Sequence, residues 1–100
     1  MRYTLPVMIN SFICKETKDV WNGIRSKRLP SDIQNIARRK LRMLNAAKTL
    51  RDLRIPPNNR LEKLSGNRAH QHSIRINKQW RIYFEWIDGG VDNVGIIDYH

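Results

Sequence analysis

The stretch WRIYFEW, residues 80–86, constrains the fold more than any other part of the chain. Its apolar residues fall at every second position, which is the period of a β-strand with one buried face. The side expected to be buried carries Trp80, Ile82, Phe84 and Trp86, and the other side carries Arg81, Tyr83 and Glu85. An Asp-Gly-Gly turn signal follows at 88–90, so the chain is expected to fold back into an antiparallel strand.

Three further segments extend this pattern into an antiparallel meander of about four strands. RLEKL (60–64) is expected to form a short strand, and QHSIRI (71–76) alternates and is joined to the strand at 80–86 by a turn at Asn-Lys-Gln. The last strand is VDNVGIIDYH (91–100). Alternation fails around Gly95, which suggests a β-bulge. Because of this break, the pattern does not fix the directions of Asp98, Tyr99 and His100.

Helices are expected in the first half of the chain, after a short strand at 8–14. The clearest helix lies within 29–50, where Ser31 and Gln34 have the spacing of a capping box. Its apolar stripe consists of Ile33, Ile36, Ala37, Leu41, Leu44 and Ala47. A weaker helix begins at Lys15 and ends near Gly23. We therefore predict one α+β domain over residues 1–100, an N-terminal strand and two helices packed on a mostly antiparallel sheet, with 1–7 an N-terminal extension if Met8 is the start.

The charge of the chain points to a polyanionic partner. Nineteen Lys and Arg against nine Asp and Glu give a formal net charge of +10, which favours nucleic acid or an anionic membrane surface. No segment approaches the roughly 20 apolar residues of a membrane span, and the N-terminus lacks a signal-peptide cleavage site. Cys14 is the only cysteine, which suits the cytoplasm, and no spacing of His and Cys suggests a metal or other cofactor.

Two basic surfaces are expected, and each has a plain alternative. Arg38, Arg39, Lys40 and Arg42 lie off the apolar stripe of the main helix and form either a solvated face or a surface for RNA or a partner. The outer face of the sheet is expected to bind single-stranded RNA by phosphate contact and base stacking. The plain alternative is that its arginines only keep an exposed surface solvated. Its candidate residues are Lys63, Arg68, Arg75, Arg81 and Tyr83.

Two short motifs have a similar choice of interpretations. The turn LSGNR (64–68) is an ordinary hairpin turn or a phosphate cradle formed by backbone N–H groups. Asp98, Tyr99 and His100 are a frayed terminus or a proton-transfer site. A base that removes a 2′-OH proton, an acid that protonates the leaving 5′-oxygen and a cation on the phosphate suffice to cleave RNA without metal.

These segments together resemble the RelE/ParE superfamily of toxins, in particular its HigB-like branch. The resemblance covers most of the chain and is carried by RKLRMLNAA (39–47), NRLEKLSGNRAHQHSIRINKQWRI (59–82) and the terminal DYH. It implies a type II toxin that cleaves mRNA on the ribosome by metal-independent 2′-OH attack and arrests growth. The family's Asp-Tyr-His, Trp-Arg and Gly-x-Arg motifs fall on residues 98–100, on Trp80 and Arg81, and on Gly66 and Arg68.

The resemblance also implies roles for these residues. His100 and Asp98 would transfer protons, Arg81 and Arg68 would stabilise the phosphate, and Tyr99 would orient or stack on a nucleotide. Where the family often has His-Pro-Leu-Lys-Gly, this chain reads Glu-Lys-Leu-Ser-Gly. Glu62 then replaces the family His as a candidate base, and Lys63 supplies a nearby charge.

The partners implied are the ribosome, mRNA and a helix-turn-helix antitoxin of the HigA type. Two other functions remain open at this point. One is a non-enzymatic inhibitor of DNA gyrase on the same fold, as in ParE-like relatives. The other is a ribosome- or RNA-binding protein that blocks translation without cleavage.

Overall fold

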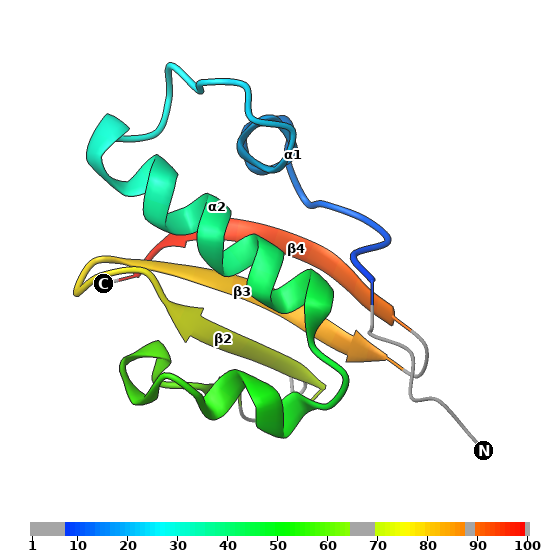
Figure 1. Ribbon diagram of the computed structural model, residues 1–100. Coiled ribbons are helices and arrows are strands. Elements are labelled where there is room, and N and C mark those ends of the chain that lie inside the picture. Colours follow the sequence, from blue (N-terminus) through cyan, green and yellow to red (C-terminus); the bar gives the residue numbers. More distant parts are fainter. Residues whose placement is uncertain (1–7, 65–69, 88–89, 100) are drawn as a thin grey trace.

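The computed structural model describes residues 8–64, 70–87 and 90–99, and it has two layers, helices and a sheet (Figure 1). Helices α1 (Lys15–Trp21) and α2 (Ser31–Ala46) form the first layer. Two 3₁₀ turns follow, η1 (Leu50–Arg54) and η2 (Pro57–Asn59). The sheet consists of β1 (Glu62–Lys63), β2 (Gln71–Arg75), β3 (Trp80–Ile87) and β4 (Gly90–Asp98). The predicted α+β class is confirmed.

The sheet is the antiparallel meander expected from the sequence, in the order β1-β2-β3-β4. A bulge lies in β4 directly before Gly95. Tyr83 pairs with Gly95 and Glu85 pairs with Asp92, so one residue of β3 faces two of β4. One of those two, Asn93, has a positive φ of 52°. Beyond the bulge the register pairs Arg81 with Ile97, which puts Ile97 on the Arg81 face of the sheet.

The expected N-terminal strand is reduced to two isolated bridges along the outer edge of β4. Ile9 bridges to Val91 and Phe12 to Val94, both in parallel orientation. Gly95 permits this close approach, because a Cβ atom there would lie 2.1 Å from Cδ1 of Ile13. The segment therefore covers the edge of β4, a common way of protecting an edge strand.

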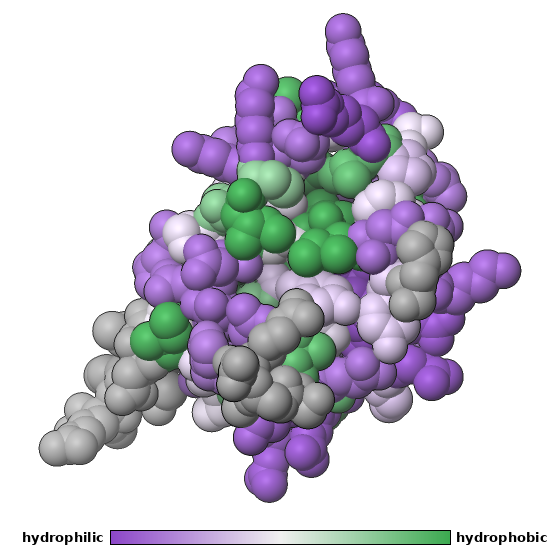
Figure 2. Space-filling view, turned by 180° about the vertical axis from the view of Figure 1, so that it is seen from behind, coloured by the Kyte–Doolittle hydropathy of each residue, from purple (hydrophilic) through white to green (hydrophobic). Residues whose placement is uncertain are grey.

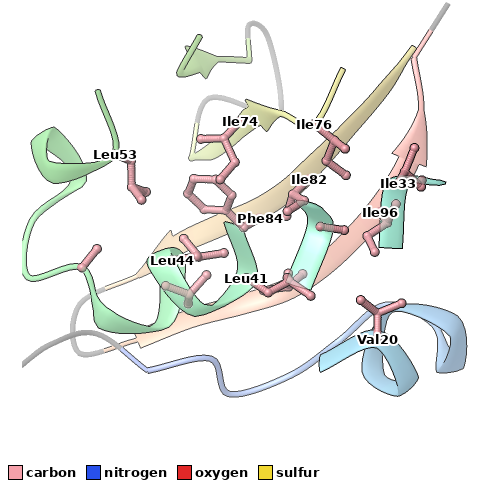
Figure 3. Packing of buried hydrophobic residues seen from close by; sticks show 14 residues of the cluster. Val20, Ile33, Leu41, Leu44, Leu53, Ile74, Ile76, Ile82, Phe84 and Ile96 are labelled. Atoms are coloured by element: carbon pink, nitrogen blue, oxygen red, sulfur yellow. The ribbon is translucent and has the colours of Figure 1, made fainter. Parts of the chain in front are cut away.

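The hydrophobic core lies between α2 and the sheet (Figure 3). Leu41 and Leu44 of the predicted helical stripe are fully buried, and they face Ile74, Ile82 and Phe84 of the sheet. The apolar residues of the helical stripe and those of the alternating strands thus pack together in one core. No helix within the described ranges has both the length and the apolar character that a membrane crossing requires.

The predicted capping box at the start of α2 is wrong. Pro30 occupies the N-cap, and no side chain caps this end. Gln34 instead accepts a hydrogen bond from the backbone N–H of Ser26 (3.0 Å) and donates to the carbonyl oxygens of Ser26 and Leu29 (both 2.8 Å). The loop before the helix buries these backbone groups, and buried polar groups need partners. That demand outweighs the local capping preference.

Candidate functional site

Arg81 lies at the centre of the candidate site and is held by three hydrogen bonds to two residues. Its Nε donates to Oγ of Ser73 (2.8 Å), and its Nη2 donates to the carbonyl oxygens of Arg60 (2.6 Å) and Ser73 (3.3 Å). Only 5% of the residue is exposed. The plain alternative, an arginine that only keeps an exposed sheet face soluble, does not fit this burial, because the chain at Arg60, just before β1, binds the guanidinium.

Two of the other candidates lie against Arg81. Oε2 of Glu62 is 3.9 Å from Nη2 of Arg81, and about half of the Glu62 side chain is exposed. The Arg81 guanidinium carbon lies 5.7 Å from the ring centroid of Tyr99, which is itself 46% exposed. We call Glu62, Arg81 and Tyr99 the Arg81 cluster. It combines an accessible carboxylate, a fixed cation and an exposed aromatic ring on one face of the sheet.

The turn between β2 and β3 positions the C-terminal end of β4. The backbone N–H of Tyr99 donates to the carbonyl oxygen of Gln79 (2.5 Å), and Nε2 of Gln79 donates to Oδ2 of Asp98 (3.2 Å). Oδ1 of Asn77 accepts from the N–H groups of Gln79 and Trp80 (both 2.8 Å) and so stabilises the turn. Tyr99 therefore continues a fixed strand.

Asp98 is not part of the Arg81 cluster. The register pairs it with Trp80, and Trp80 packs against the core on the helical side. Successive strand residues point to opposite faces, so Asp98 and Tyr99 leave the sheet on opposite sides.

Of the remaining predicted residues, Arg75 lies directly opposite Arg81 in the pairing of β2 with β3. Lys63 pairs with His72 and shares its face of the sheet rather than that of Glu62. Arg75 lines a groove beside α2, and Tyr83 lines a second groove on the face of Arg81. Gly66, Arg68 and His100 lie outside the described residues.

The groove at Tyr83 extends the candidate site along the open face of the sheet. It has a volume of about 250 Å³, and Ile13 and Ile97 line it together with Tyr83. Figure 2, which looks at the side opposite to Figure 1, shows apolar residues near the middle of the surface with hydrophilic residues around them. An apolar hollow next to a fixed arginine is suited to a nucleotide base beside its phosphate.

A polar network around Glu85 lines part of this groove. Its carboxylate accepts hydrogen bonds from Asn93 (2.9 Å) and Gln71 (3.3 Å) and lies 3.3 Å from Nε2 of His70. The bonds from Asn93 and Gln71 lower the pKa of Glu85. Sequence reasoning missed this network, as it missed Ser73 and Arg60, because their contacts depend on strand register rather than on any motif.

His72 is a buried histidine that the candidate chemistry does not use. It is 8% exposed and stacks on Phe84 at a centroid distance of 5.9 Å. Burial lowers the pKa of His72, and the nearby charges of Lys63 and His70 act in the same direction, against a contact with the His70 backbone. Its neutral form is therefore favoured in the folded state.

We expect His72 to make stability depend on pH. With its pKa lowered on folding, the unfolded chain binds more protons than the native protein as the pH falls below about 6.5. The free energy of unfolding therefore has its full contribution from the neutral imidazole above that pH. This contribution decreases as the pH falls toward the folded-state pKa. Urea denaturation at several pH values should show this loss, and His72→Phe should reduce the slope. An unchanged slope in the variant would assign the effect to other groups.

Among the described residues, no cluster of three His, Cys, Asp or Glu side chains is arranged to hold a metal ion. The chemistry available at the Arg81 cluster is that of a carboxylate, a guanidinium and a phenol. Such groups can transfer protons and stabilise a developing negative charge.

Comparisons with known proteins agree with the resemblance seen in the sequence. Residues 12–100 match the model of the RelE-like toxin of the type II toxin-antitoxin system HigB. Toxin HigB-1 of Vibrio cholerae is 48% identical over 80 residues, which cover 74% of this chain and 84% of that protein. An uncharacterized protein of Haemophilus influenzae is 36% identical over 72 residues, covering 72% of this chain and 71% of its own length.

A solved structure supports the fold independently. The YoeB dimer from Staphylococcus aureus aligns with a TM-score of 0.57 over 98% of this chain and 99% of that one. The two sequences are 16% identical, so this similarity concerns the arrangement of helices and strands alone.

Proposed function

Because the chain belongs to the HigB-like family of RelE-like type II toxins, we propose that it is a ribosome-dependent mRNA endonuclease. It cleaves by attack of a 2′-OH on the adjacent phosphate, without a metal ion or other cofactor, and so inhibits translation in the cytoplasm. The observation that carries the proposal is the Arg81 cluster, which brings together a cation, a carboxylate and the aromatic ring of Tyr99; in the sequence, His100 is the residue after Tyr99.

In the proposed reaction the 2′-oxygen forms a bond to phosphorus and the bond to the 5′-oxygen breaks. Glu62 is the candidate base for the 2′-OH proton, and His100 is the candidate acid that protonates the leaving oxygen. Half of the Glu62 side chain is exposed, so its carboxylate can meet a substrate. The products are a 2′,3′-cyclic phosphate and a new 5′-OH end.

Arg81 has the role of stabilising charge on the phosphate. Its bonds within the described residues use Nε and Nη2, and the phosphate contact is proposed for the N–H groups of Nη1. A guanidinium that is already fixed loses little entropy when it binds. Because Tyr99 lies over it, the ring meets an incoming nucleotide first, and a base can stack there.

The other predicted residues receive secondary roles in this proposal. Tyr83 lines the adjoining groove and is a candidate to contact the neighbouring base. Asp98 is bonded to Gln79 and would position the end of the chain rather than exchange protons. Arg68 and Lys63, at the Gly-x-Arg turn and on β1, remain candidates for phosphate contact, and so does Arg75, which pairs with Arg81 across the sheet.

An assay with purified ribosomes distinguishes the three candidate functions. The protein should cut a defined mRNA on ribosomes, cut the same RNA poorly when it is free, and leave 2′,3′-cyclic phosphate ends. An intact message on stalled ribosomes would instead identify a translation blocker. Loss of gyrase supercoiling with the message intact would identify a ParE-like inhibitor.

A further inference from the structure

A groove beside α2 is lined by none of the three residues of the Arg81 cluster, although one of its lining residues, Arg75, pairs with Arg81 across the sheet. It has a volume of about 680 Å³ and is bounded by α2, the chain at Pro56 and Asn58, and the turn after β2. Aliphatic side chains from two of these elements line it, namely Ile36, Met43 and Ile76. We call it the α2 groove.

Four cationic residues surround the apolar part of the α2 groove: Arg39, Lys40, Arg75 and Lys78. Within the described part of the chain, no acidic residue lines it. Nζ of Lys40 is bonded to Oδ1 of the buried Asn59 (2.5 Å), so this ammonium group is held in place. An apolar hollow with a fixed cationic rim is complementary to an apolar side chain flanked by carboxylates.

The cations in the groove also oppose one another. Burial lowers the pKa of Lys40, and the charges of Arg39 and Arg75 lower it further. An anionic ligand would offset this repulsion and favour the charged amine. An acidic partner should therefore bind more favourably to this group of cations than to an isolated surface lysine.

From this geometry we propose that the α2 groove binds an acidic segment of the cognate antitoxin, with one large apolar side chain of that segment in the hollow. A type II toxin has a protein antitoxin as its partner, and a toxin with a net charge of +10 attracts an acidic one. An RNA strand would use the cations through its phosphates, but among the described residues no aromatic side chain lines this groove for a base to stack on, unlike the groove at Tyr83. The proposal rests on family membership and is independent of nuclease activity.

Charge reversals with a matched control test this site. Arg39→Glu combined with Lys78→Glu removes two cations of the rim. Arg42→Glu combined with Arg51→Glu makes the same change in net charge at two exposed residues that do not line the groove. Affinity for the purified cognate antitoxin is measured by biolayer interferometry, and cleavage on ribosomes is measured in parallel.

The groove pair should weaken antitoxin binding on the order of 100-fold, and the control pair by less than about threefold. Cleavage on ribosomes should be similar for both pairs. If both pairs lose the same affinity for the antitoxin, the loss is caused by the change in net charge and not by the groove, and the proposal is overturned. Unchanged antitoxin affinity with reduced cleavage would make the groove a ribosome-facing surface, which also overturns it. A protein without nuclease activity still gives a decisive binding result.

Methyl NMR on the unsubstituted toxin gives a second, independent test. Met43 lines the groove, whereas Met8 is exposed elsewhere. With methionine methyl groups labelled, addition of the antitoxin should shift the Met43 signal by more than the Met8 signal. A Met43 signal that stays in place in the saturated complex would exclude the groove as the docking site.

Discussion

Replacing Arg81 with methionine should slow the cleavage of ribosome-bound mRNA by about 10²–10³-fold, the cost of removing one fixed donor from a site of developing charge. Methionine keeps an unbranched side chain but loses both the charge and the donors. The three hydrogen bonds to Ser73 and Arg60 are lost as well. Single-turnover cleavage at saturating toxin measures the chemical step, and binding to ribosomes is measured separately.

Two companion variants separate the chemistry of Arg81 from its structural role. Ser73→Ala removes the acceptor of the Nε bond but keeps the guanidinium, so the cleavage rate should fall by less than in Arg81→Met. Arg42→Met removes a cation from an exposed position on α2 and should leave the rate unchanged. If Arg81→Met folds and cleaves at the rate of the unsubstituted protein, Arg81 has no catalytic role.

Replacing Leu41 with alanine should lower the free energy of unfolding by about 2–5 kcal/mol, the range for a fully buried leucine. Leu41 has no exposed surface and lies in the core between α2 and the sheet (Figure 3). For a chain of this size, each kcal/mol shifts Tm by roughly 4–8 °C. The total stability of a small domain is only about 5–15 kcal/mol, so a large part of it should be lost.

Urea denaturation of Leu41→Ala and of Arg42→Ala, its exposed neighbour on the same helix, measures this effect. Arg42→Ala should change the free energy of unfolding by less than about 0.5 kcal/mol. A similar small change in Leu41→Ala would mean that α2 is not packed on the sheet in solution.

The sheet and the main helix were predictable because both signals are periodic. Strict alternation in 80–86 and the apolar stripe of α2 each identify one buried face, and the structure packs these faces together. Local preferences were less reliable. Ser31 and Gln34 fit a capping box, but Gln34 binds the preceding loop instead, a contact that only the three-dimensional path of the chain creates.

The candidate site was predictable in its residue types and less so in its arrangement. The charge excess and the terminal motif pointed to Arg81 and Tyr99, which do lie together. The burial of Arg81 depends on Arg60 and on the pairing of β2 with β3. Asp98 lies on the face of the sheet opposite to the cluster because of the strand register beyond the bulge in β4. A one-residue shift there would exchange Asp98 and Tyr99, and no sequence motif fixes such a shift.

We propose that the C-terminal end of this chain takes part in cleaving mRNA on the ribosome. The most direct test compares the unsubstituted protein with His100→Ala on ribosomes programmed with a 3′-labelled or 5′-labelled message, with product ends identified chemically. We expect 2′,3′-cyclic phosphate ends from the unsubstituted protein and a large loss of cleavage in the variant. Equal cleavage by both proteins would contradict the role of His100, and intact messages with both would contradict the endonuclease itself.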